Sequence, residues 1–422
     1  MKSRRDILRS GASVAAVGLL PKIALGQTAA PKVVVVGGGF AGATCARMLK
    51  RLAPHIAVTL VEQNATFTAC PFSNEVLAGL RDIKDQEFDY KKIVAEGVNL
   101  AVMSATGIDT QARTVTLSNG SSLAYDRLVV APGVDFRWDA VPGYTEATAE
   151  RMPHAWKAGA QTLLLRQQLQ AMEDGGLVVI AAPANPYRCP PGPYERASLI
   201  AHYLKSKKPK SKLVILDAKD AFSKQKLFEE GWKALYPGLI EWVSLSQGGK
   251  VSSVDPASMT IATDFEKYKA AVVNIIPPQK AGKIAELAGV ADRTGWCPID
   301  PVTFQSALQP NIHVIGDASI AGAMPKSAFA ANSQAKVCAA AVAKLLSGGT
   351  VAQSKLINTC YSLLAPDYGI TVAGVYHPVN GQLVDVQGAG GTSPANAPAA
   401  IRTLEASLAS GWFKTITAEV FG

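Results

Sequence analysis

Residues 32–42 read KVVVVGGGFAG, running from Lys32 through Val36 to Gly42. The four valines form a short β-branched run, which is typical of a buried parallel strand. The glycines that follow have the spacing G-x-G-x-x-G, and a helix is expected from Ala43 to Leu52. A strand before this motif and a helix after it together predict a dinucleotide-binding unit.

The glycines of this unit have separate roles. Gly37 permits the tight turn, Gly39 lets the backbone approach a pyrophosphate, and Gly42 lets the helix pack closely on the strand. Free N–H groups at the start of the helix would face the phosphates. A second strand at 57–61 ends on Glu62, which is placed to bond ribose hydroxyls. We therefore expect these four residues to bind the cofactor.

Length, composition and charge limit the class of protein. The chain has 422 residues, of which 48% are hydrophobic and 18% charged, so it can form two or three domains with substantial cores. Its net charge is +9, but five basic residues and one acidic residue lie within 1–27, which leaves about +5 for the remainder. This small surplus argues against a nucleic-acid partner.

Residues 1–27 have the pattern of a twin-arginine signal peptide. The pair Arg4-Arg5 precedes an apolar run at 12–20, and Ala24-Leu25-Gly26 resembles a signal-peptidase site. The alternatives are an amphipathic N-terminal helix and a transmembrane anchor, but the apolar run is far shorter than the roughly 20 residues that a span needs. We expect export to the periplasm, no transmembrane anchor and conditions that permit disulfides.

Two later segments favour FAD over NAD. Residues 123–133, ending on Gly133, resemble the strand-and-turn motif that flavoprotein disulfide reductases carry after their first nucleotide-binding unit. Residues 311–318, containing Asp317, resemble the second FAD motif of the same enzymes, in which this Asp contacts the ribityl chain. The alternative for each segment is a buried core strand ending in a turn, but three matches in the family order between residues 33 and 318 favour FAD binding. The expected fold class is α/β, with two Rossmann-like domains and a small C-terminal α+β cap. The FAD domain would comprise 31–150 and 285–350, the second domain 151–284, and the cap 351–422.

The second domain starts as a nucleotide-binding unit but continues differently. A helix is expected at 160–172 and a strand at 176–182, where NAD(P)H-dependent enzymes continue into a glycine-rich loop. Residues 183–193 instead hold five prolines and one glycine. Prolines fix φ and occupy the space of a pyrophosphate, so we expect no nicotinamide cofactor here.

Over nearly its whole length the chain resembles the flavoprotein subunit of flavocytochrome c sulfide dehydrogenase, a relative of sulfide:quinone oxidoreductase. The contexts of Cys70 (ACPFSNEV, 69–76), Cys189 (RCPPGP, 188–193) and Cys360 (INTCYS, 357–362) carry the resemblance most specifically. It implies that Cys70 is bonded to the flavin 8α-methyl group. It also implies that Cys189 and Cys360 form a redox-active disulfide over the flavin, which hydrosulfide attacks to give a persulfide and a thiolate.

Alternatives remain for each cysteine. Cys70 is otherwise a buried free thiol, and the disulfide is otherwise structural. Cys45, Cys297 and Cys338 compete with Cys360 for Cys189, because pairing does not follow from sequence. Cys45 and Cys338 fall in expected helices among apolar neighbours and are predicted to be core residues.

Two charged residues complete the candidate site. Glu195, six residues after Cys189, can relay a proton; the alternative is a surface carboxylate at a helix start beside Arg196. The segment 324–328 opens an expected helix that runs to Leu346, and its positive end and Lys326 would stabilise negative charge on the flavin. The alternative for Lys326 is a solvated side chain.

The resemblance implies FAD-dependent oxidation of hydrogen sulfide, with electrons passed to a c-type cytochrome subunit in a heterodimer. No C-x-x-C-H motif is present, so haem c would lie only on the partner chain, and no metal site is expected on this one. One alternative is a sulfide:quinone oxidoreductase, which needs a lipid-contacting surface, although no basic amphipathic C-terminal helix is evident. Another is a flavin-binding protein without turnover.

Overall fold

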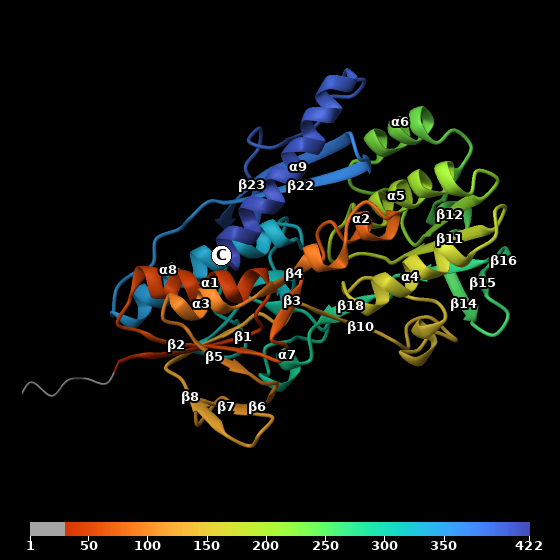
Figure 1. Cartoon of the computed structure of the whole chain (residues 1–422). Helices are drawn as coiled ribbons and strands as arrows, with labels where there is room; N and C mark the ends of the chain where they lie inside the picture. The colour runs from red at the N-terminus through yellow and green to blue at the C-terminus, as the bar shows by residue number, and fades with distance from the viewer. Residues whose placement is uncertain (1–29) are drawn as a thin grey trace, which may run out of the picture. The chain divides into compact units, whose positions relative to one another are not determined.

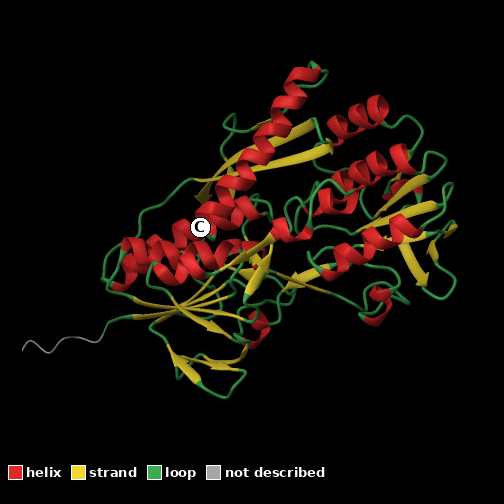
Figure 2. Ribbon diagram, viewed as in Figure 1, coloured by secondary structure: helices red, strands yellow, loops and turns green. Residues whose placement is uncertain are grey.

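The computed structural model describes residues 30–422, so the expected signal peptide at 1–27 lies outside the described residues. Residues 31–422 form one unit that contains two parallel sheets with helices packed against them (Figures 1 and 2). The predicted α/β class is therefore confirmed.

The first sheet has the strand order β20-β9-β1-β2-β5, and all its neighbours are parallel. Its strands are β20 (Ile312–Val314), β9 (Arg127–Val130), β1 (Lys32–Val36), β2 (Ala57–Glu62) and β5 (Asn99–Val102). The four valines of β1 are buried, as a central strand covered on both faces requires. Because β20 pairs with β9, the chain returns to this sheet after it has built the second one.

Two long helices pack together beside the first sheet: α1 (Phe40–Leu52) and α8 (Ala328–Leu346). The expected start of the first helix, Ala43, is three residues late, because Gly39 is its N-cap. The expected start of the second is too early: Ser327 is the N-cap, and its hydroxyl accepts from Ala330 N at 3.0 Å. A serine hydroxyl satisfies a free N–H of the first turn, which Pro325 cannot do.

The second sheet has the order β13-β12-β11-β17 and is also parallel. Its strands are β13 (Ile240–Val243), β12 (Lys212–Asp217), β11 (Leu177–Ala182) and β17 (Val272–Ile275). The helices of this part are α4 (Ala160–Ala171), α5 (Gly192–Lys207) and α6 (Gln225–Leu235). The proline-rich segment 183–193 lies between β11 and α5 and contributes the first two residues of the helix, so its loop lies at the carboxyl end of β11, where open α/β sheets bind ligands.

Short antiparallel pairs and sheets surround the two parallel sheets. They are β3 (Thr66–Thr68) with β4 (Glu87–Asp89); β6 (Ala105–Asp109), β7 (Thr114–Leu117) and β8 (Ser122–Ala124); β10 (Val134–Phe136) with β18 (Gln279–Ala281); and β14 (Val251–Asp255), β15 (Thr260–Thr263) and β16 (Lys267–Lys269). The parallel pair β19 (Cys297–Pro298) and β21 (Ser319–Ile320) and the short helices α2 (Ser73–Ala78), α3 (Lys91–Ala95) and α7 (Ile284–Leu287) complete these parts.

The C-terminal segment combines a hairpin with a long helix. Its strands are β22 (Leu356–Ala365), β23 (Tyr368–Val379), β24 (Gln382–Asp385) and β25 (Gly391–Thr392), and α9 (Ala399–Val420) packs on β23 (Figure 1). The sequence predicted an α+β cap at 351–422 without locating its helix, which the structure shows to be 22 residues long. Within residues 30–422, no helix has the length and apolar character needed to cross a bilayer.

Candidate active site

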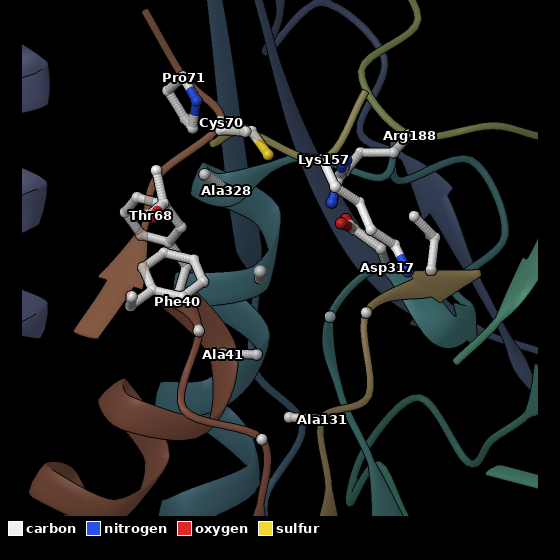
Figure 3. Close-up of a pocket in the computed structure, with 18 of the residues that line it drawn as sticks. Phe40, Ala41, Thr68, Cys70, Pro71, Ala131, Lys157, Arg188, Asp317 and Ala328 are labelled. Atoms are coloured by element: carbon white, nitrogen blue, oxygen red, sulfur yellow. The ribbon is translucent and has the colours of Figure 1, made fainter. Parts of the chain in front are cut away.

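A cavity of about 1160 Å³ is lined by residues of the FAD domain, the second domain and the C-terminal segment. Nine of the eleven predicted site residues line it: Gly37, Gly39, Glu62, Cys70, Gly133, Cys189, Glu195, Asp317 and Cys360. Figure 3 shows the Cys70 sulfur pointing into this space, with Arg188, Lys157 and Asp317 across from it. The two predicted residues that do not line the cavity are Gly42 and Lys326.

The glycine turn brings the backbone close together. Gly37 has φ +103°, and a Cβ there would lie 2.3 Å from Ala131 O. A Cβ on Gly42 would lie 1.8 Å from Gly37 O, so Gly42 acts by letting α1 pack on the turn and does not line the site. Gly39 has no capping side chain, so the first N–H groups of α1 remain available to a ligand. These features fit a pyrophosphate at the start of α1.

Glu62 is held in place by the backbone. Its Oε2 accepts from Gly38 N at 2.7 Å, and its Oε1 accepts from Asn64 N at 3.0 Å. A carboxylate fixed at the end of β2 beside the glycine turn is suited to accept from ribose hydroxyls. This arrangement fits the adenosine half of FAD.

Asp317 has an acceptor that no protein group uses. It follows β20, and its Oδ1 is buried without a hydrogen-bond partner among the described residues. Burial raises the pKa of this carboxyl, although Arg188 and Lys326 act in the opposite direction. A buried oxygen of this kind needs a donor, and a hydroxyl of the ribityl chain would supply one. The residues of this half of the cavity thus fit FAD, which is not part of the structure.

Lys326 does not have the predicted position. It lies before the N-cap of α8, and its Nζ donates to Asp317 O at 2.7 Å and Ser319 O at 2.8 Å. The ammonium also lies 3.9 Å from the centroid of the Trp296 ring. Burial lowers the pKa of Lys326 to about 8. The side chain therefore fixes the turn that carries Asp317 instead of lining the flavin cavity, and it is not solvated.

The three cysteines that carry the resemblance come from separate segments. Cys70 lies between β3 and α2, Cys189 in the loop before α5, and Cys360 on β22. All six cysteines are free thiols. Burial raises the pKa of the Cys189 thiol, and the nearby acidic groups of Glu195 and Cys360 raise it further. The thiol is therefore neutral at pH 7. The Cys360 sulfur accepts from Asn358 Nδ2 at 3.3 Å.

Glu195 is not a surface residue. Its Oε2 accepts from Asn74 Nδ2 at 3.1 Å, and its Oε1 accepts from Leu363 N at 3.0 Å. Burial raises the pKa of the carboxyl. The surface alternative is therefore wrong, since Arg196 beside it is also buried, at 2% exposure. A carboxyl near Cys189 with a raised pKa holds its proton more strongly than an exposed glutamate and is suited to exchange it with a reacting group.

The sequence interpretation missed the buried cations of the site. Arg196 lines the cavity and donates to Asn74 Oδ1 and Asn274 Oδ1 and to the carbonyls of His154 and Ala155. Burial lowers its pKa to about 10. These bonds hold the loop that places Trp156 over the cavity. Adjacency to Glu195 was the only sequence signal for it.

Lys224 was missed as well. It is the N-cap residue of α6, and its Nζ donates to Cys360 O at 3.0 Å and Ser362 Oγ at 2.8 Å. Nothing in the residues around it marked it in the sequence, because its partners lie more than 130 positions further along the chain.

The second sheet ends in a filled crevice. Asp217, at the carboxyl end of β12, is fully buried. Its oxygens accept from Tyr194 OH at 2.5 Å, Trp242 Nε1 at 3.0 Å and Lys219 Nζ at 2.5 Å. In nucleotide-binding relatives an acid at this place bonds the ribose. Here protein groups take both of its oxygens, and aromatic rings occupy the space beside it.

The remaining cysteines lie away from the cavity. Cys45 on α1 and Cys338 on α8 are fully buried, as predicted for core residues. Cys297 is buried in β19. None of the three lines the cavity beside Cys189.

Comparison with known proteins identifies the family. The family model for the central part of the sulfide dehydrogenase (flavocytochrome c) flavoprotein chain matches residues 162–277, and the corresponding flavin-binding model matches 352–421. The model for pyridine nucleotide-disulphide oxidoreductases matches 31–180. The sulfide dehydrogenase flavoprotein chain of Chlorobaculum thiosulfatiphilum is 60% identical over 45 residues, 11% of this chain and 94% of that sequence. The chain belongs to this flavocytochrome c sulfide dehydrogenase family.

Members of the wider group of sulfide-oxidising flavoproteins are also similar. The mitochondrial sulfide:quinone oxidoreductase of Mus musculus is 22% identical over 308 residues, which cover 68% of this chain and 65% of the mouse protein. The crystal structure of the sulfide:quinone oxidoreductase of Aquifex aeolicus has a TM-score of 0.68 at 17% identity and covers 92% of both chains. This chain thus shares its fold with the Aquifex aeolicus enzyme.

Proposed function

We propose that this flavoprotein chain oxidises hydrogen sulfide to sulfur or polysulfide with FAD and passes the electrons to a c-type cytochrome. The supporting observation is the meeting of Cys189, Cys360 and Glu195 in one cavity with the residues that fit FAD. Membership of the flavocytochrome c sulfide dehydrogenase family supports the choice of substrate.

In the proposed reaction Cys189 and Cys360 start as a disulfide, and the structure presents them in the dithiol form. The sulfur of hydrosulfide bonds to Cys189 Sγ, the bond between the two cysteines breaks, and Cys360 leaves as a thiolate. The electron pair of that bond stays on Cys360, and the sulfide sulfur is oxidised to a persulfide. Glu195 takes up the persulfide proton.

Bound FAD supplies a two-electron acceptor that releases electrons one at a time. We propose that Cys70 bonds it covalently, because the Cys70 sulfur points into the cavity opposite Asp317 (Figure 3). A covalent bond would keep the cofactor on an exported protein. The signal-like residues 1–27 support the proposal of twin-arginine export and a periplasmic site of action.

A cytochrome acceptor is proposed for two reasons. One-electron release suits a haem, and the Chlorobaculum relative is the flavoprotein chain of a flavocytochrome c. Because no C-x-x-C-H motif occurs in the sequence, the haem would be bound by a partner chain in a heterodimer. The filled crevice at Asp217 supports the proposal that NADH is not the electron donor.

A quinone acceptor is the second candidate, favoured by one observation. The outer face of α9 exposes Ile401, Leu404 and Leu408, with exposed fractions of 38%, 52% and 50%. This spacing forms an apolar stripe on one side of the helix. However, the helix has only two basic residues, Arg402 and Lys414, and Arg402 is buried. It therefore lacks the basic face that is common on membrane-binding helices.

An anaerobic titration tests the proposed function. We expect sulfide, but not NADH, to bleach the flavin absorbance of the purified holoprotein. Subsequent addition of a c-type cytochrome should restore the absorbance faster than addition of a short-chain quinone. Bleaching by NADH alone would overturn the proposal, and faster reoxidation by the quinone would favour the second candidate.

A further inference from the structure

The buried side chain of Lys224 lies behind the reactive cysteine of the C-terminal segment. Its Nζ donates to Cys360 O at 3.0 Å, Ser362 Oγ at 2.8 Å and Ile370 O at 3.2 Å. The residue does not line the cavity and is only 9% exposed. It adopts a left-handed backbone conformation with φ +61° at the start of α6, so an uncommon conformation directs this side chain to β22 and β23.

Lys224 has no counter-ion among the described residues, which distinguishes it from a similar lysine nearby. Lys219 is also 9% exposed, but its Nζ lies 2.5 Å from Asp217. None of the ion pairs among residues 30–422 includes Lys224. An unpaired buried ammonium is costly, whereas neutral donors could hold the same three oxygens at lower cost. The positive charge itself therefore needs an explanation.

The groups around the ammonium show where a balancing charge can arise. Burial lowers the pKa of Lys224 to about 8. Four acidic groups raise this pKa in part; from the largest effect to the smallest they are Cys360, Glu195, Cys189 and Glu405. These groups come from β22, α5, the loop before α5 and α9. The α6 helix contributes the Phe228 ring, 5.8 Å from Nζ. Three of the four groups belong to the candidate active site.

We propose that Lys224 is a positioning residue that holds the Cys360 strand and stabilises the anionic sulfur of Cys360. This inference rests on the proposed function, in which Cys360 leaves as a thiolate when hydrosulfide bonds to Cys189. The negative charge carried in by hydrosulfide then resides on Cys360, beside an ammonium that had no anionic partner. Asn358 Nδ2, 3.3 Å from the sulfur, donates to the same anion from another side. The positive charge of Lys224 thus favours breakage of the disulfide with Cys360 as the leaving thiolate.

The test measures thiolate formation without turnover. The holoprotein is reduced, freed of reductant and treated with iodoacetamide between pH 5.5 and 9.5, and labelling of Cys360 is followed by peptide mass spectrometry. Iodoacetamide reacts with the thiolate. In Lys224→Met and Lys224→Gln we expect the curve of labelling rate against pH to move to higher pH by about one unit, as for the loss of a nearby opposite charge. Lys224→Arg should keep the wild-type curve.

Lys205→Met is the matched control, because this lysine also donates to a main-chain carbonyl, that of Leu235, but lies at the surface. Its curve should equal that of the wild type. Lys224→Gln retains hydrogen-bond donors and carries the test if Lys224→Met does not fold. Sulfide-dependent acceptor reduction should show kcat about tenfold lower in Lys224→Gln, with the KM for sulfide within twofold.

Coincident labelling curves for wild type, Lys224→Gln and Lys224→Arg would overturn the inference, as would an equal displacement of the curve in Lys224→Arg and Lys224→Gln. Failure of sulfide to bleach the wild-type flavin would instead refute the proposed function. The labelling curves do not depend on sulfide, so the two failures are distinguishable.

Discussion

Replacing Gly42 by alanine tests whether close packing of α1 on the glycine turn shapes the cofactor site. The new Cβ would lie 1.8 Å from Gly37 O and 3.3 Å from Ala131 Cβ. Since Cβ atoms essentially never approach other heavy atoms within 3.0 Å, helix and turn must separate by about 1.2 Å, the difference between 3.0 and 1.8 Å. Overpacking of this kind costs about 1–3 kcal/mol, and the better helix propensity of alanine offsets about 1 kcal/mol.

We therefore expect Gly42→Ala to lower the free energy of unfolding by up to about 2 kcal/mol. The same displacement moves the N–H groups of α1 away from the phosphates, so less FAD should be retained. The assay combines thermal melting with flavin absorbance per mole of protein. Gly411→Ala is the matched control, because Gly411 also lies inside a helix, α9, and its Cβ would meet open space. It should stabilise the protein by about 0.5–1 kcal/mol. Wild-type melting and flavin content in Gly42→Ala would refute the reasoning.

Three further predictions concern single side chains. In Cys70→Ala, flavin fluorescence should disappear from the protein band of a denaturing gel, whereas persistence of the band would exclude this covalent link. Because the pKa of Glu195 is raised, its carboxylate forms at higher pH than in an exposed glutamate. The rate of flavin reduction by sulfide should therefore rise with pH. In Glu195→Gln this rise should be absent, and the reduction step should be about 10²-fold slower. An unchanged pH profile in the variant would count against the proton relay. Asp217→Asn leaves the Lys219 ammonium buried without its counter-ion, so the free energy of unfolding in denaturant melts should fall by about 3 kcal/mol. Bleaching of the flavin by sulfide should be unchanged. Slower bleaching would assign Asp217 a part in the reaction.

Local patterns predicted the first sheet well. Three short-range signals marked it: the valine run of β1, the glycine spacing and the acid at the end of β2. In a strand-turn-helix unit these signals indicate a buried strand, a phosphate-binding turn and a ribose-binding carboxylate. The same holds for the proline-rich loop, which lies at the carboxyl end of β11 as expected. The placement of Cys189 and Cys360 in one cavity depended on the resemblance, because no local pattern links positions so far apart.

Other features depend on tertiary contacts and could not be predicted from the sequence. The α9 helix is rich in alanine, serine and threonine and includes Gly411, so its apolar periodicity is weak, and packing on β23 stabilises it. Lys326 resembled a residue of a helix start, but the serine after it is the stronger cap. The environment of Lys224 exists only after the second domain meets the C-terminal hairpin, and that of Arg196 only after the second domain meets α2, which carries Asn74.

The hydrogen bond from Cys189 N to Lys326 O, 2.8 Å long, has a further consequence for protein engineering. It fastens the proline-rich loop of the second sheet to the segment that leads into α8, while Cys360 is carried by a separate hairpin. The spacing of the two sulfurs is thus set by three anchor points distributed over about 170 positions of the chain. Grafting the loop alone onto another flavoprotein would transfer a cysteine without its partner, so a functional transplant requires all three segments together.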